Sequence, residues 1–211
     1  MLHNHQPRHD PERIWIDKLE PKVEALRAEL LRLPPDDVAR RTGATLVGDS
    51  LRLAMLFDDY VADTTSYVVS KPDGSDVNFF LQSLVLTYLG TTKGAPPAER
   101  WITFRDLPNG SFYNQAFQGY APDRLAKRWQ LDITGFETAC RALEGTPIGY
   151  GDAGFAFTVL PRVDIAAIYW LGDEDFASKA SILFDATAHS HMVIDGLAIL
   201  GSRLVDRILV Q

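Results

Sequence analysis

Residues 155–171, FAFTVLPRVDIAAIYWL, decide the fold class of this chain. Phe155, Phe157 and Val159 alternate with smaller or polar residues, which is the period of a strand that buries one face. A second apolar run, Val163–Leu171, follows after the short segment Leu160-Pro161-Arg162. Two strand-forming segments joined by so short a turn predict an antiparallel hairpin.

Helical segments flank this hairpin on both sides. Ile194–Leu209 carries apolar residues three and four positions apart and predicts a C-terminal helix. The same spacing from Ile16 to Leu33 predicts a long N-terminal helix. Further helices are expected near residues 77–90, 112–118, 122–129 and 136–143, and further strands near 44–47, 51–57, 61–69, 101–104 and 181–184.

This mixture predicts one α+β domain over residues 12–211, with a mainly antiparallel sheet packed by several helices. Residues 1–11 are polar and contain prolines, so we expect a flexible N-terminal tail. We expect a turn of the chain at Asp58-Asp59. We expect Ser75 to cap the helix that follows Ser75, and a brief helix to begin at Asp173-Glu174-Asp175.

The composition excludes several classes of function. The 211 residues carry 21 Lys and Arg against 28 Asp and Glu, a formal net charge of -7. Nucleic acids and anionic membranes require a basic surface, so we expect neither as a partner. The one cysteine, Cys140, cannot form an internal disulfide or an iron–sulfur site. No apolar stretch approaches the roughly 20 residues of a membrane span, so we expect a soluble, cytoplasmic protein.

An aromatic-rich corner surrounds the Pro-Asn-Gly turn of Trp101–Phe117. Its rings and two polar groups can form the wall of a pocket for a flat ligand. The alternative is that most of the rings simply pack in the core. The candidate ligand-binding residues are Trp101, Arg105, Phe112, Tyr113, Asn114 and Phe117.

A His-x-His pair, His189 and His191, lies between the last strand and the last helix. On an extended segment both imidazoles lie on one face, a spacing that metal sites use, and Asp185 or Asp195 can complete the coordination sphere. A metal ion or a tetrapyrrole is therefore a candidate cofactor. The structural alternative is that Asp195 caps the helix while a histidine bonds a local carbonyl group.

Two further motifs are set aside. Residues 149–154, GYGDAG, match the G-x-G-x-x-G dinucleotide pattern, but a strand and not a helix is expected to follow them, so we reject the match. Cys140 lies among apolar helix residues, which indicates an inert buried thiol.

Four segments together resemble the uncharacterised prokaryotic family catalogued as domain of unknown function 3786. They are DDVARRTGA (36–44), WITFRDLPNGSFYNQAF (101–117), YGDAGFAFTVLPRVDIAAIYWLGDEDF (150–176) and ILFDATAHSHMVIDGLAILG (182–201). The resemblance covers residues 20–209 and supplies no catalytic residue. Relatives with an added four-cysteine iron–sulfur module imply a link to anaerobic redox or corrinoid one-carbon chemistry. This chain has one cysteine and lacks that module.

Three functions remain open. The leading hypothesis is a cytoplasmic accessory protein that binds a small ligand or cofactor between the Trp101–Tyr120 region and the Asp185–His191 loop. The enzyme alternative is a metal-dependent hydrolase or lyase, in which the metal lowers the pKa of a bound water. The third is a protein-interaction module that docks a protein partner on an exposed apolar stripe of the N-terminal helix.

Overall fold

The predicted hairpin forms the centre of a five-stranded sheet. β7 (Ala153–Leu160) pairs with β8 (Val163–Trp170), and Pro161-Arg162 make the turn between them. The computed structural model describes residue 21 and residues 23–211. The five strands follow the order β5-β9-β8-β7-β6, and every pairing is antiparallel. The remaining strands are β9 (Lys179–Asp185) and the short edge strands β5 (Trp101–Thr103) and β6 (Thr146–Pro147).

A second antiparallel sheet precedes it in the chain. Its strand order, β1-β2-β3-β4, follows the sequence. The strands are β1 (Thr45–Val47), β2 (Ser50–Met55), β3 (Asp58–Asp63) and β4 (Val69–Ser70). The expected strand over residues 61–69 is thus interrupted. Asp63 Oδ1 accepts hydrogen bonds from the backbone N–H groups of Thr65 and Ser66, and this turn ends β3.

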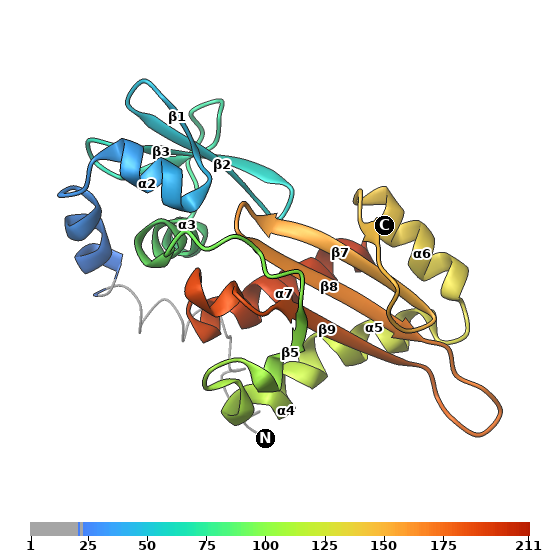
Figure 1. The fold of residues 1–211 in the computed structure, drawn as a ribbon. Helices are drawn as coiled ribbons and strands as arrows, with labels where there is room; N and C mark the ends of the chain where they lie inside the picture. Colours follow the sequence, from blue (N-terminus) through green and yellow to red (C-terminus); the bar gives the residue numbers. More distant parts are fainter. Residues whose placement is uncertain (1–20, 22) are drawn as a thin grey trace, which may run out of the picture.

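The helices complete a single α+β domain, which confirms the predicted fold class. In Figure 1, α5, α6 and α7 lie along one face of the five-stranded sheet, and α2 and α3 lie beside the four-stranded sheet. The helices are α2 (Pro35–Thr42), α3 (Phe79–Thr91), α4 (Gly110–Tyr120), α5 (Pro122–Trp129), α6 (Ile133–Ala142) and α7 (Ile194–Leu209). Short 3₁₀ helices are η1 (Phe104–Asp106) and η2 (Ala188–Ser190). Among the described residues, none of these helices is both long enough and apolar enough to cross a membrane.

The predicted N-terminal helix begins outside the described residues, as does the predicted tail at residues 1–11. Residues 23–30 are helical, and Val23 and Leu30 of the apolar stripe are buried. Leu26 lies against α3, where a Cβ atom on Gly90 would meet it at 2.5 Å. Gly90 therefore permits close packing and does not end α3. Val23, Leu26 and Leu30 of the stripe thus pack within the monomer, whereas Leu33 at its end is exposed. The exposed stripe that would favour an interaction module is therefore absent from residues 23–30.

The turn between β2 and β3 differs from the prediction. Asp58 and Asp59 belong to β3, and the turn residues are Leu56 (φ 52°) and Phe57 (φ 72°). A two-residue hairpin turn favours positive φ at both positions, which is costly for large side chains. Here the cost is offset by tertiary contacts: Leu56 is buried, and its N–H donates to the carbonyl oxygen of Val159 in β7 at 2.9 Å.

A second local prediction is also wrong. α3 begins at Phe79 and is capped by Asn78, whose side chain accepts a hydrogen bond from the N–H of Leu81 at 3.0 Å, so Ser75 is not its cap. Both residue types are good N-caps. The apolar run that must be buried therefore decides where the helix begins.

The start of α4 depends on a glycine. A Cβ atom at Gly110 would overlap the carbonyl oxygen of Phe104, whereas one at Gly119 in the same helix would meet nothing within 4 Å. We expect Gly110→Ala to lower the free energy of unfolding by about 3 kcal/mol, because the helix must move away from η1. Gly119→Ala, the matched control, should be neutral or stabilising by up to about 1 kcal/mol. Urea unfolding of the two variants measures the difference, and equal stabilities would contradict the close packing.

Candidate functional site

The aromatic residues predicted to line a pocket separate into core and surface. Phe117 is buried and stacks on Phe104, with ring centroids 4.3 Å apart, and Phe184 of β9 closes the cluster. In contrast, Phe112 is 84% exposed and Tyr113 is also exposed on the surface of α4.

The other predicted members do not join them. Arg105 is exposed in η1, and the side chain of Asn114 accepts a hydrogen bond from Gln118 within α4. Trp101 is partly buried on the five-stranded sheet, against Ala166, Ile168 and Leu183. The core-packing alternative thus holds for Phe104 and Phe117, and the set does not converge on one hollow.

The two histidines of the His-x-His pair point apart. His189 lies within η2 (Ala188–Ser190), and His191 follows it as the C-cap residue. His189 is exposed, whereas His191 is fully buried. Asp195 is exposed in the first turn of α7. The part of the chain that the structure describes contains no group of three or more His, Cys, Asp and Glu able to hold a metal ion.

Asp185 is buried at the end of β9, with only 1% of its surface exposed. Its Oδ1 accepts hydrogen bonds from the N–H groups of Ala98 (3.0 Å) and Thr187 (2.8 Å). Burial acts to raise the pKa of Asp185, but these N–H donors and the Thr187 hydroxyl outweigh it and hold that pKa below its ordinary value. The carboxylate therefore joins the segment before β5 to the segment after β9.

His191 lies nearby, where the ends of several elements meet. Its backbone oxygen accepts a hydrogen bond from the hydroxyl of Thr91 at the end of α3, 2.8 Å away. Within the described part of the chain, neither buried ring nitrogen of His191 nor Oδ2 of Asp185 has a partner that meets hydrogen-bond geometry. Burial and the nearby positive charge of Arg162 lower the pKa of His191, against the smaller opposing effects of the Ala95 backbone and of Asp185. We call this region the junction: the C-terminal ends of α2 and α3, the β7–β8 turn and residues 185–191.

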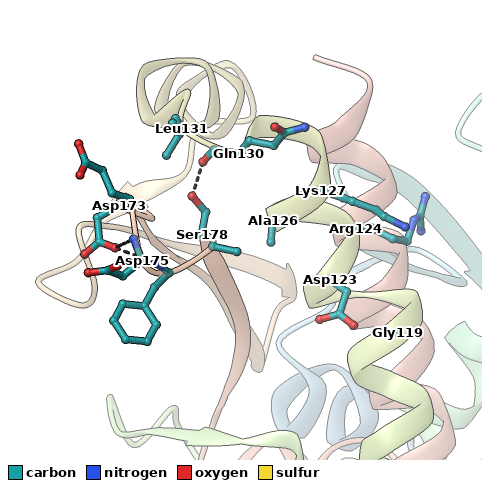
Figure 2. Close-up of a pocket in the computed structure, with 13 residues that line it drawn as sticks. Gly119, Asp123, Arg124, Ala126, Lys127, Gln130, Leu131, Asp173, Asp175 and Ser178 are labelled. Carbon is teal, nitrogen blue, oxygen red and sulfur yellow. Dashed lines mark hydrogen bonds between the residues drawn. The ribbon is translucent and has the colours of Figure 1, made fainter.

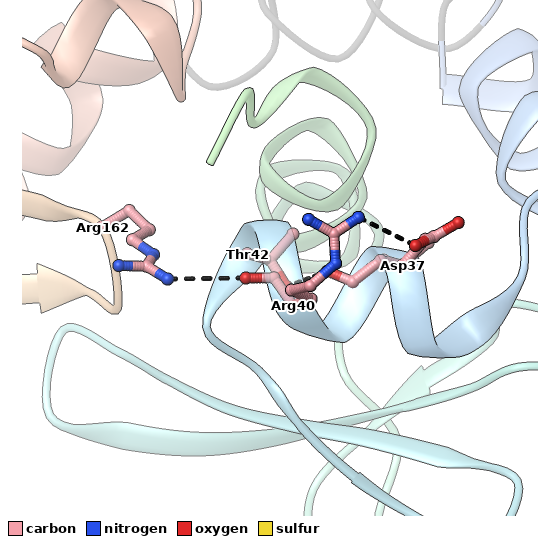
Figure 3. Close-up of polar contacts among 5 residues, drawn as sticks. Asp37, Arg40, Thr42 and Arg162 are labelled. Atoms are coloured by element: carbon pink, nitrogen blue, oxygen red, sulfur yellow. Dashed lines mark hydrogen bonds and ion pairs between the residues drawn. The ribbon is translucent and has the colours of Figure 1, made fainter. Parts of the chain in front are cut away.

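Arg162 connects the turn of the hairpin to α2. Its Nη2 atom donates to the carbonyl oxygen of Arg40, 3.4 Å away, near the C-terminal end of α2 (Figure 3). A cation at the end of a helix is favourable because the last carbonyl groups carry partial negative charge. The hydroxyl of Tyr88 in α3 donates to the carbonyl oxygen of the neighbouring Thr42 at 2.6 Å. The junction thus joins the two halves of the fold through polar contacts, of which the Tyr88 bond is buried and the Arg162 bond is exposed. Its histidine is fully buried and not open to a substrate.

A surface groove lies elsewhere, between α5 and the loop that joins β8 to β9 (Figure 2). Its volume is about 740 Å³. It is lined by Gly119, Asp123, Arg124, Ala126, Lys127, Gln130, Leu131 and residues 173–178. A second hollow continues it along the start of β9 and shares Asp123, Ala126, Phe176, Ala177 and Ser178 with it. We call the two together the α5 groove.

Hydrogen bonds hold the β8–β9 loop against the end of α5 at the edge of the α5 groove. Ser178 Oγ donates to the carbonyl oxygen of Gln130 at 2.5 Å, and the hydroxyl of Tyr169 donates to the same oxygen at 2.7 Å. Gln130 has φ 47° and ψ −111°, a conformation that is costly for a residue with a side chain. Instead of opening a helix, Asp173 accepts the N–H groups of Asp175 and Phe176 at its Oδ1 and closes a compact loop.

Sequence reasoning did not find this groove. The acidic run at residues 173–175 was expected to open a brief helix, and Val163–Leu171 was expected to form a strand of the hairpin. The available signal was Phe176, an aromatic residue inside an acidic loop, which is 68% exposed. The prediction that the Cys140 thiol is buried is confirmed, and burial raises the pKa of this thiol. Residues 149–154 lead into the strand β7 and not into a helix, in agreement with the rejected dinucleotide motif.

Comparison with known proteins gives one match. The model of the family described as domain of unknown function (DUF3786) matches residues 34–207. No curated protein and no solved structure matches the chain.

The buried His191 predicts a pH dependence of stability. Its folded pKa lies below the unfolded value, so the unfolded chain binds the additional proton as the pH falls below about 6.5. This stability is complete above that pH, and we expect it to decrease by up to about 1.4 kcal/mol per pH unit between pH 6.5 and 5. Asp185 contributes in a lower window, below about pH 4, because its folded pKa is depressed.

Urea unfolding at several pH values tests this assignment. His191→Gln should flatten the dependence between pH 5 and 7, whereas the same substitution at the exposed His189 should leave it as in the parent chain. An unchanged slope in His191→Gln would show that another group carries the transition.

Proposed function

The chain belongs to the DUF3786 family, whose function is unknown. We propose that it is a cytoplasmic accessory protein that binds a small organic ligand in the α5 groove. Its link to anaerobic redox or corrinoid one-carbon chemistry stays a prediction from the family resemblance. The observation that carries the proposal is the groove itself, with its volume of about 740 Å³ and its exposed apolar lining.

The size and lining of the groove support this proposal. Binding sites for small molecules commonly enclose about 300–1,000 Å³ and combine apolar walls with a few polar groups. Leu131 is 67% exposed and Phe176 is 68% exposed at this groove. Large apolar side chains gathered at a surface hollow are typical of an interaction site.

Hydrogen bonds within the chain hold the β8–β9 loop at the edge of the groove, which also supports binding. The hydrogen bonds of Ser178 and Tyr169 to Gln130 hold the loop against α5. A pre-formed wall lowers the entropy cost that a ligand would otherwise have to offset. The strained backbone of Gln130 at the same place agrees with the tendency of strain to concentrate at functional sites.

The other two hypotheses gain less support. The metal-dependent enzyme requires His189 and His191 to face one ion, whereas His189 is exposed and His191 is fully buried. The interaction module requires an exposed stripe, and Val23 and Leu30 are buried. The site proposed here is centred on α5 and shares only Gln118 and Gly119 with the predicted region Trp101–Tyr120.

Blocking the groove tests the proposal. Ala126 lines both hollows, so we expect Ala126→Trp to fill them and to abolish the binding of fragments found in an NMR screen of the parent protein. Ala142→Trp is the matched control, because Ala142 is exposed at the end of α6 and lines neither hollow.

Tyr113→Ala separates the groove from the corner first predicted. Tyr113 lines neither hollow, so its removal should leave fragment affinities unchanged. The proposal fails if no fragment shifts the amide signals of the groove, or if the fragments bind Ala126→Trp as well as the parent.

A further inference from the structure

The α5 groove has aromatic and aliphatic walls. Phe176 lines both of its hollows, Trp170 lines the one along β9, and Leu131 lines the one at the end of α5. All three side chains are substantially exposed, and so is the neighbouring Leu171. The faces of aromatic rings attract positive charge because their π electrons form a negative surface.

Negative charge is concentrated beside these rings. Asp123 contributes a carboxylate from α5, and Asp173, Glu174 and Asp175 contribute three more from the loop. Asp173 is engaged in holding the loop, since its Oδ1 accepts two backbone N–H groups. The exposed carboxylates of Asp123, Glu174 and Asp175 remain to contact a ligand.

Two of the three positive groups that line the groove, Arg124 and Lys127, are directed away from the loop. Figure 2 shows the side chains of Arg124 and Lys127 extending from α5 on the side away from the loop. Arg124 forms an ion pair with Asp206 of α7 at 2.7 Å, which draws its charge toward that helix. Lys179 borders the hollow along β9 at the opposite end of the loop from Asp173.

We propose that the ligand of the α5 groove is a small organic cation, an ammonium group that carries apolar substituents. This inference rests on the proposed function and adds the charge of the ligand to it. The apolar substituents contact Leu131 and Ala126, while the charged nitrogen lies between the ring of Phe176 and the carboxylates. An anionic ligand of the same size would meet the same carboxylates and be repelled. A neutral one would lose the attraction of both the rings and the carboxylates.

A pair of probes that differ only in charge tests this inference. Choline and its neutral isostere 3,3-dimethyl-1-butanol are titrated into the intact chain, and binding is followed by NMR shifts of the amides of Leu131, Phe176 and Ser178. We expect choline to bind at least about tenfold more tightly than the alcohol, and added salt to weaken choline alone.

Substitutions then assign the effect to the groove. Asp123→Asn and Phe176→Leu should each lower the choline affinity by roughly threefold or more, and leave the affinity for the alcohol nearly unchanged. Asp49→Asn is the control for net charge, because Asp49 is an exposed turn residue between β1 and β2 and lies in neither hollow. It should not alter choline binding.

The outcomes separate this inference from the proposed function. If both probes bind the groove with equal affinity, or if Asp49→Asn weakens choline as much as Asp123→Asn, the cation preference is overturned while the groove remains a binding site. If neither choline nor any screened fragment shifts the groove amides, both proposals fail.

Discussion

The arrangement of this fold depends on the contact between the β2–β3 turn and β7. The N–H of Leu56 donates to the carbonyl oxygen of Val159, and the ring of Phe57 lies edge-on to Phe157 with centroids 6.1 Å apart. Because β7 belongs to the central hairpin, this contact positions the four-stranded sheet relative to the five-stranded one. It also stabilises two positive φ angles that large residues would otherwise avoid. Arg207 of α7 lies near the same turn, 3.6 Å from a carboxylate oxygen of Asp58.

The junction is a second contact between the two halves of the fold, and it is polar. Arg162 connects the hairpin to the end of α2, and Asp185 joins two loops through backbone N–H groups. A buried polar group such as Asp185 stabilises one arrangement because any other arrangement leaves it without partners. The junction is accordingly better suited to holding the elements together than to chemistry. The groove lies away from it, on the side of the five-stranded sheet where α5 and the β8–β9 loop meet.

Much of the fold could be predicted from the sequence, because in long helices and strands the spacing of the apolar residues indicates which face is buried. α7 begins at Ile194 and ends at Leu209 as predicted, and the central hairpin pairs as expected. The predictions are wrong where tertiary contacts override the local preference of a segment for a turn or a helix start. Asp58-Asp59 has the composition of a turn, but the burial of Leu56 moves the turn two residues earlier. The candidate site was harder to predict, since the α5 groove is formed by segments about fifty residues apart in sequence that carry no common motif.

The contact between the two sheets affects how cooperatively the chain unfolds. The hydrogen-bond ladders of β7, β8 and β9 are complete within the five-stranded sheet, and the four-stranded sheet adds no strand to them. Opening of the four-stranded sheet would break the turn contact and the junction but would leave those ladders and the α5 groove assembled. We therefore expect two units of the domain to exchange with solvent at different free-energy costs. The unit that carries the groove is the one that keeps its structure when the other opens.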